Sequence, residues 1–145
     1  MTMTVASNLL APAAALALWS FVVMFWMVAK RLPALKAAKI PAEKTVGGRG
    51  QDLDKILPPR TNWPSHNYTH LMEQPTVFYP VIVILALLDQ GTGLNVTLAW
   101  GYVGLRIIHS FWQIQVNTIP VRALIFFISS LLLLILTVNA LIAAL

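Results

Sequence analysis

The stretch LNVTLAWGYVGLRIIHSFWQIQVNTI, from Leu94 to Ile119, is long and apolar enough to cross a membrane, yet it carries Arg106 and His109 in its middle. A membrane-spanning helix needs roughly 20 predominantly apolar residues. A charged side chain at the bilayer centre costs about 2.5–3.5 kcal/mol on insertion scales, so such residues face inward, are paired and usually have a function. Glu73 lies just inside another apolar run. We expect the chemistry of this chain to involve these three residues.

The composition of the whole chain also indicates a membrane protein. Apolar residues make up 58% of the 145 residues and charged residues only 10%, whereas soluble domains are about 45–50% apolar and about 25% charged. The sequence therefore predicts an all-α integral membrane protein, a single domain over residues 1–145 that forms a four-transmembrane-helix bundle. The expected helices cover about residues 9–29, 65–88, 96–116 and 123–144.

Residues 30–64 are expected to form a mobile cytoplasmic loop. This segment contains Gly-Gly and Pro-Pro pairs among its charges, which is typical of a loop. Its first ten residues are able to continue the first helix beyond the membrane surface, with a bend or break at Pro33. The loop is either a solvated linker or a flap that supplies Arg49, Lys55 or Arg60 to an anionic ligand.

The basic residues predict the orientation in the membrane. Eight of the ten lysines and arginines fall between the first and second expected helices, and Arg122 falls between the third and fourth. The positive-inside rule therefore places both connections in the cytoplasm and both termini on the non-cytoplasmic side. The net charge of +5 then reflects topology and contact with anionic lipids. Nucleic acid is not an expected partner, because no motif of that class is present.

Two of the expected helices carry a polar stripe. Residues at helical steps of four and three share one face of the second helix; they are His66, His70 and Glu73. The third helix carries a similar stripe, which contains Arg106, His109 or Ser110, and Gln113. The two stripes lie at a similar depth, so the long Arg106 side chain is expected to reach toward Glu73.

These stripes allow more than one interpretation. They suit a ligand site, but they equally suit the packing of helices or subunits, since polar contacts in lipid contribute about 0.6–2 kcal/mol each and fix the packing register. The His66, His70 and Glu73 set has metal-ligand residue types without a recognised metal spacing, so we predict no metal. The chain has no cysteine, and any thiol chemistry must use the sulfur of a substrate.

Two segments resemble the bacterial branch of the MAPEG superfamily, the membrane-associated proteins in eicosanoid and glutathione metabolism. They are NYTHLMEQPTVFY (Asn67–Tyr79) and LAWGYVGLRIIHSFWQIQVNTIPVR (Leu98–Arg122), and the resemblance covers roughly residues 5–145. It implies a homotrimer of four-helix subunits in the bacterial inner membrane. It also implies that glutathione, as co-substrate, lies in a cleft between neighbouring subunits that opens toward the cytoplasm.

The resemblance also assigns roles to residues. The glutathione-using members carry an Arg-x-x-x-Asn-x-x-Glu pattern, where this chain has His66, His70 and Glu73, so only the glutamate is kept. The catalytic residues implied are Arg122, as activator of the thiol, and Ser110. The implied glutathione-binding residues are Glu73, Arg106, His109, Gln113, His70, His66 and Asn67. Phe126 stands where the eukaryotic enzymes have a tyrosine that contacts the sulfur or the cofactor.

The function expected from this resemblance is a membrane-embedded glutathione-dependent transferase or peroxidase acting on lipophilic electrophiles or peroxides. One alternative is a non-enzymatic structural, accessory or lipid-binding trimer that uses the same polar residues for packing. A small channel or transporter is a weaker alternative, because no pair of Gly- or Pro-broken spans indicates a midplane transport site.

Overall fold

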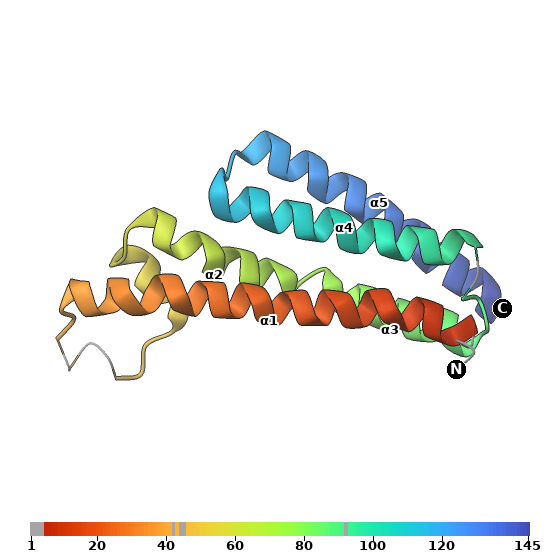
Figure 1. Cartoon of the computed structure of the whole chain (residues 1–145), viewed down its shortest axis with the longest axis horizontal. Coiled ribbons are helices and arrows are strands. Elements are labelled where there is room, and N and C mark those ends of the chain that lie inside the picture. The colour runs from red at the N-terminus through yellow and green to blue at the C-terminus, as the bar shows by residue number, and fades with distance from the viewer. Residues whose placement is uncertain (1–4, 42, 44–45, 92) are drawn as a thin grey trace.

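The computed structural model describes residues 5–41, 43, 46–91 and 93–145. In this part of the chain the elements are α1 (Val5–Ala38), the 3-10 helix η2 (Gly50–Lys55), α2 (Pro59–Leu71), α3 (Pro75–Leu87), α4 (Gly93–Gln115) and α5 (Ile119–Ala144). The α4–α5 hairpin lies along a layer formed by α1, α2 and α3 (Figure 1). The start of α1 and the end of α5 lie at one end of the bundle, and η2 lies at the other (Figure 1).

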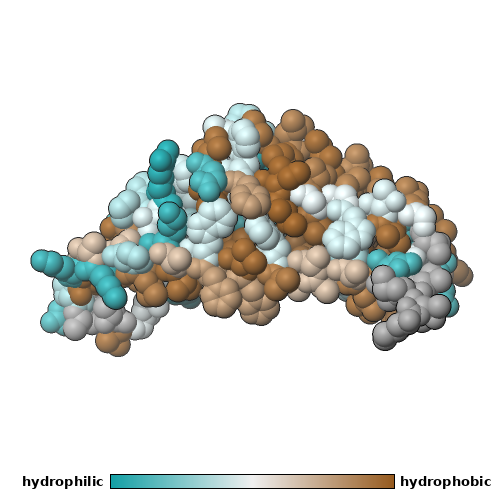
Figure 2. Space-filling model, viewed as in Figure 1, coloured by the Kyte–Doolittle hydropathy of each residue, from teal (hydrophilic) through white to brown (hydrophobic). Residues whose placement is uncertain are grey.

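Three segments of the described chain are long and apolar enough to span a membrane: Asn8–Ala38, Pro59–Leu87 and Ile119–Ala144. The helix α4 is long enough as well, since its 23 residues extend about 35 Å at about 1.5 Å per residue. Its inward polar residues, Arg106 among them, lower its hydropathy. Figure 2 shows apolar residues across the middle of the molecule and hydrophilic ones gathered near the η2 end. The all-helical membrane protein predicted from the sequence is confirmed.

The first helix continues well beyond residue 29, and Pro33 does not end it. A proline inside a helix removes one backbone hydrogen bond, and at this water-facing end the freed carbonyl remains available to water. The alanine- and lysine-rich segment that follows is a good helix former. The helix ends where Lys39 adopts the left-handed conformation, with φ of 44°, followed by Pro41. The first nine residues of the expected loop, 30–38, therefore belong to α1.

The second expected helix, 65–88, is two helices separated by the turn Met72–Gln74. Pro75 explains the break, because it lacks an N–H group and its ring would collide with the carbonyl of Leu71 in a continuous helix. The first of the two helices begins at Pro59, six residues before the expected start, since a proline is well suited to the first helical turn. The last helix begins at Ile119, with Pro120 in its first turn, rather than at residue 123.

The loop between α1 and α2 is attached to both helices. The Arg31 Nη2 atom donates hydrogen bonds to Asp54 Oδ1 at 3.0 Å and to Asn62 Oδ1 at 3.1 Å. Asp54 Oδ2 also lies 2.8 Å from His66 Nε2. Leu57, just after η2, is 4% exposed and anchors the end of the loop. Asp54 and Leu57 thus attach this part of the loop to α1 and α2.

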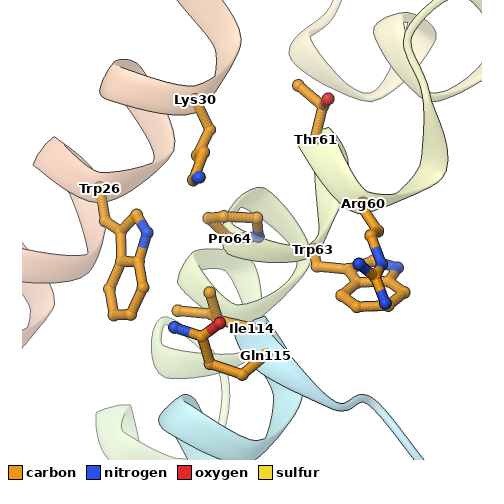
Figure 3. Close-up of a pocket in the computed structure, with 8 residues that line it drawn as sticks. All are labelled: Trp26, Lys30, Arg60, Thr61, Trp63, Pro64, Ile114 and Gln115. Atoms are coloured by element: carbon orange, nitrogen blue, oxygen red, sulfur yellow. The ribbon is translucent and has the colours of Figure 1, made fainter.

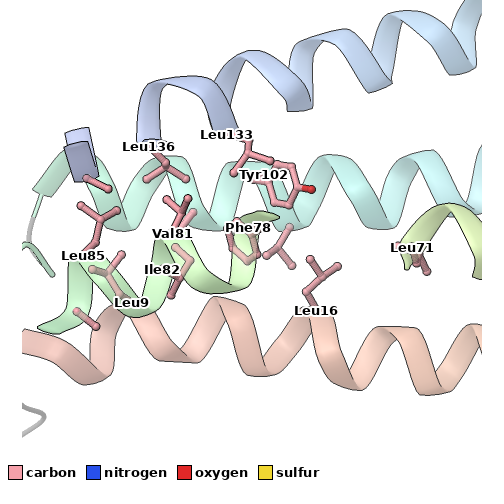
Figure 4. Close-up of a cluster of buried hydrophobic side chains, with 14 of the residues drawn as sticks. Leu9, Leu16, Leu71, Phe78, Val81, Ile82, Leu85, Tyr102, Leu133 and Leu136 are labelled. Carbon is pink, nitrogen blue, oxygen red and sulfur yellow. The ribbon is translucent and has the colours of Figure 1, made fainter. Parts of the chain in front are cut away.

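The apolar core fills the half of the bundle away from this loop (Figure 4). Three α1 residues spaced by seven are fully buried, and they are Leu9, Leu16 and Val23. A seven-residue spacing keeps one face of a helix against its neighbours. Gly101 lets α4 and α5 approach closely, since an added Cβ would lie 3.1 Å from Leu132. Polar residues join α4 and α5 at the far end, where Asn139 Nδ2 donates to Asn95 Oδ1 at 2.8 Å, and a larger polar group lies in the loop-side half of the bundle, where α2, α4 and α5 meet.

Candidate functional site

A cavity of about 200 Å³ lies between α2, α4 and the first turns of α5. We call it the basic cleft, and its lining residues are His70, His109, Ile119, Arg122, Ala123 and Phe126. The polar side chains come from three different helices, so the tertiary fold brings them together. The turn before Pro75 ends α2 one residue after His70. It thereby fixes how far along the bundle α2 places the His70 side chain.

Arg106 lies at the inner side of this cleft and has no exposed surface. Its Nη2 atom donates a hydrogen bond to the backbone carbonyl of His70 at 2.9 Å. Its guanidinium carbon lies 5.9 Å from the centre of the Phe126 ring, within the range of a cation–π contact. The Nε and Nη1 atoms have no hydrogen-bond partner among the residues that the structure describes. Because a buried charge needs its donors satisfied, two vacant donors mark a place for an acceptor.

The break before Pro75 explains why Arg106 contacts a carbonyl and not Glu73. In a continuous helix the carbonyl of His70 would accept the N–H of Gln74, whereas in the turn it accepts the guanidinium. The Glu73 side chain points outward and is 63% exposed. The expected Arg106–Glu73 contact is therefore replaced by an Arg106–His70 contact through the backbone.

The two histidines and Glu73 form a short row at the cleft. His70 Nδ1 lies 3.0 Å from Glu73 Oε2, and the ring of His70 lies 5.0 Å from that of His109 in an edge-to-face arrangement. His109 is 1% exposed, and its Nε2 atom has no hydrogen-bond partner within the described part of the chain. The cleft thus combines one carboxylate at its rim with several nitrogen groups inside it.

Arg122 is held at the entrance of α5. Its Nη1 atom donates to Asn117 Oδ1 at 2.7 Å, and Asn117 adopts a left-handed conformation with φ of 59° in the α4–α5 turn. The N-terminus of a helix carries a partial positive charge, so a cation there is electrostatically unfavourable. Arg122 and the first turn of α5 together give the cleft a positive field that favours an anionic ligand.

Phe126 forms one wall of the cleft. Its ring stacks on His70 with 5.2 Å between ring centroids and 30° between planes. It brings no hydroxyl group, so the hydrogen-bond donors and cations of the cleft come from His70, His109, Arg106 and Arg122.

Besides Arg106 and Glu73, four more of the expected site residues lie outside the lining of the cleft. Ser110 is fully buried and its hydroxyl is occupied, since it accepts from Trp19 Nε1 at 3.1 Å and donates to the Arg106 carbonyl at 2.9 Å. Asn67 Nδ2 donates to Gln113 Oε1 at 2.9 Å, joining α2 to α4. His66 faces the loop, where it contacts Asp54. The structure thus groups His70, Arg106, His109 and Arg122, with Glu73 at their edge.

Sequence reasoning missed two features of this cleft. One is the backbone carbonyl of His70 as the acceptor for Arg106, and the other is Ile119, which lines the cavity at the start of α5. Pro75 was the available signal for the first, because a proline breaks the helix in the turn before it, and the break leaves the His70 carbonyl without its helical partner. The apolar pattern gave no signal for the second.

These features define a class, a multi-pass membrane protein whose helical bundle carries an open basic cleft beside a buried arginine. The model of the MAPEG family matches residues 9–142, and the chain belongs to this family. The MAPEG fold is a four-helix membrane bundle, in which the broken α2–α3 unit is the second span. The family includes glutathione transferases and peroxidases and commonly binds glutathione. No curated protein and no solved structure matches the chain.

Proposed function

We propose that this protein is a membrane-embedded glutathione-dependent transferase or peroxidase that acts on lipophilic electrophiles or peroxides. The observation that carries the proposal is the fully buried Arg106 with two vacant donor nitrogens, beside a cavity lined by Arg122 and two histidines. An anionic tripeptide would satisfy these donors through charge-assisted hydrogen bonds. Glu73, exposed at the rim, would accept the glutathione ammonium group.

The proposed chemistry begins with the thiol of glutathione. A free thiol has a pKa near 8.5, and a cation beside the sulfur favours the thiolate, which is the nucleophile. Arg122 is the cation at the mouth of the cleft and serves this role. In conjugation the sulfur forms a bond to carbon while the leaving group departs with its electron pair. In peroxide reduction two glutathione molecules are oxidised to the disulfide while the peroxide yields an alcohol and water.

Equilibrium binding of glutathione to the detergent-purified protein tests this proposal. We expect saturable binding to the wild type, loss of binding in Arg106→Met, and weaker binding in Glu73→Gln. In Arg122→Gln we expect bound glutathione without the ultraviolet absorbance of its thiolate. Lys36→Gln is the matched control, since Lys36 is an exposed cation outside the cleft. Absence of binding at millimolar glutathione, with every variant folded by its thermal unfolding, would reject the proposal.

A second candidate function is a non-enzymatic homotrimer in which the same groups join subunits. The observation that favours it is that two expected site residues already have hydrogen-bond partners within the chain. His66 contacts Asp54, and the Ser110 hydroxyl donates to the Arg106 carbonyl. In this case Glu73 would pair with a neighbouring subunit. Glu73→Ala is then expected to dissociate the oligomer in light scattering, whereas an enzyme would keep its oligomeric state and lose glutathione affinity.

A further inference from the structure

A second cavity, of about 250 Å³, lies where the loop-side parts of α1 and α4 meet the start of α2. It is separate from the basic cleft, with which it shares no lining residue. Figure 3 shows the Lys30 side chain extending toward its centre, with the Trp26 and Trp63 rings on opposite sides. Its remaining lining includes Ile114 and Gln115 from the end of α4.

The cavity has an excess of positive charge. Lys30 and Arg60 line it, none of its lining residues is acidic, and neither cation has a carboxylate within 4.0 Å in the described part of the chain. The start of α2 adds about half a positive charge, and the end of α4 adds about half a negative one. These two contributions roughly cancel. The two full side-chain charges therefore decide the sign, and they favour an anion.

Arg60 is already oriented for such a ligand. Its guanidinium carbon lies 5.5 Å from the centre of the Trp63 ring, and Figure 3 shows it lying over that ring. Stacking of this kind limits the motion of the long side chain and leaves the N–H groups at its edge available for a phosphate. Fixing the side chain beforehand lowers the entropy cost of binding.

The position of the cavity along α1 indicates where its ligand comes from. Lys30 is the first charged residue after the apolar part of α1, so the cavity lies at the depth where the hydrocarbon region ends. Tryptophan is enriched at this interface, and Trp26 and Ile114 supply an apolar side to the cavity. A cavity with both cations and an apolar wall at headgroup depth matches a molecule that is anionic at one end and apolar at the other.

We propose that this cavity binds the phosphate group of an anionic lipid headgroup. Lys30 and Arg60 contact the phosphate oxygens, while Trp26 and Ile114 contact the glycerol and the first methylene groups. Arg60 is the loop-side residue that fixes the headgroup, and Lys30 reaches it from α1. The site ties a lipid to the junction of α1, α2 and α4, and its occupation is independent of glutathione in the basic cleft.

Native mass spectrometry of the full-length protein with defined lipids tests this proposal. The probes are phosphatidylglycerol and phosphatidylcholine, and the pocket variant is Lys30→Gln with Arg60→Gln. We expect the affinity of the pocket variant for phosphatidylglycerol to fall about 30-fold, roughly fivefold for each basic residue near an anionic surface. Phosphatidylcholine, whose phosphate is balanced by its own ammonium cation, is expected to bind the wild type more weakly and to lose less affinity in the pocket variant. The matched control, Lys36→Gln with Lys55→Gln, removes two exposed cations from the same side of the bundle and should stay within about threefold of the wild type.

A competition arm distinguishes the source of the phosphate. Glycerol phosphate, which lacks acyl chains, is expected to leave bound phosphatidylglycerol in place at millimolar concentration. If it displaces the lipid or binds alone with the same dependence on Lys30 and Arg60, the site belongs to soluble phosphate compounds and the lipid assignment is wrong. Equal losses in the pocket and control variants, or none in either, would overturn the site itself. A third variant, Trp63→Leu, keeps both charges but removes the ring on which Arg60 stacks. It should weaken the binding of phosphatidylglycerol and leave the binding of glutathione as in the wild type.

Discussion

At Phe126 the cleft lacks a hydroxyl group, which the proposed glutathione chemistry would use to contact the sulfur. Its ring contacts His70 and lies under Arg106, so a hydroxyl added at its tip would remain beside the lining of the cavity. We expect Phe126→Tyr to raise the turnover of glutathione with a chloronitroaromatic electrophile about tenfold, the effect of one added hydrogen bond to a charged group. The rate of conjugate formation and the thiolate absorbance measure this change.

The control for this substitution is Phe127→Tyr. Phe127 is 69% exposed and does not line the cleft, so its added hydroxyl should leave turnover unchanged. An equal response of the two variants would show that the hydroxyl acts on solubility or insertion and not on the sulfur. Loss of activity in Phe126→Tyr alone would place the reacting sulfur elsewhere in the cleft.

At the scale of an element, the break between α2 and α3 has the largest consequence for the site. Pro75 releases the His70 carbonyl for Arg106 and turns Glu73 outward. Pro75→Ala restores an N–H group and lets the helix continue through the turn. We expect glutathione affinity to fall at least about tenfold, since Arg106 then loses its acceptor, a charge-assisted bond of about 1.5–3 kcal/mol. Calorimetric titration with glutathione measures the loss.

Pro80→Ala is the matched control for the break. Pro80 lies inside α3 and is exposed, and its helix continues without interruption, so the control should bind glutathione like the wild type. Pro80→Ala is expected to unfold at or above the wild-type temperature, because it gains a helix former, whereas Pro75→Ala also loses the Arg106 bond and is expected to unfold at a lower temperature than Pro80→Ala. A Pro75→Ala protein that binds glutathione normally would mean that the turn does not position Arg106.

The elements also show what the sequence was able to predict. Apolar runs located the helices well, because a span must be apolar along about 20 residues regardless of its partners. The break escaped prediction because prolines are tolerated inside membrane helices when other groups satisfy the freed carbonyls, and here that group, Arg106, is 36 residues away in sequence. Likewise His66 was expected to join His70 and Glu73 in the site, but it contacts Asp54, which lies in a loop that carries no periodic signal.

At the scale of the whole molecule, the chain exposes much apolar surface. Large apolar residues on α1 and α5, such as Leu18 at 67% and Phe127 at 69%, are exposed. Such a surface needs lipid or another subunit to cover it. Most of the charged residues lie toward the η2 end, opposite the start of α1 and the end of α5 (Figures 1 and 2). The distribution of charge thus provides the physical basis for a single orientation in the membrane.

The orientation is the last prediction, and the absence of cysteine makes it straightforward to test. Val46 and Leu145 are 82% and 99% exposed and lie on opposite sides of the membrane if the basic loop is cytoplasmic. A membrane-impermeant maleimide applied to intact cells should label Leu145→Cys and spare Val46→Cys until the membrane is opened. The cysteine-free parent is the control for background labelling. The reverse pattern would place the loop outside, and it would move the mouth of the basic cleft away from the cytoplasmic supply of glutathione.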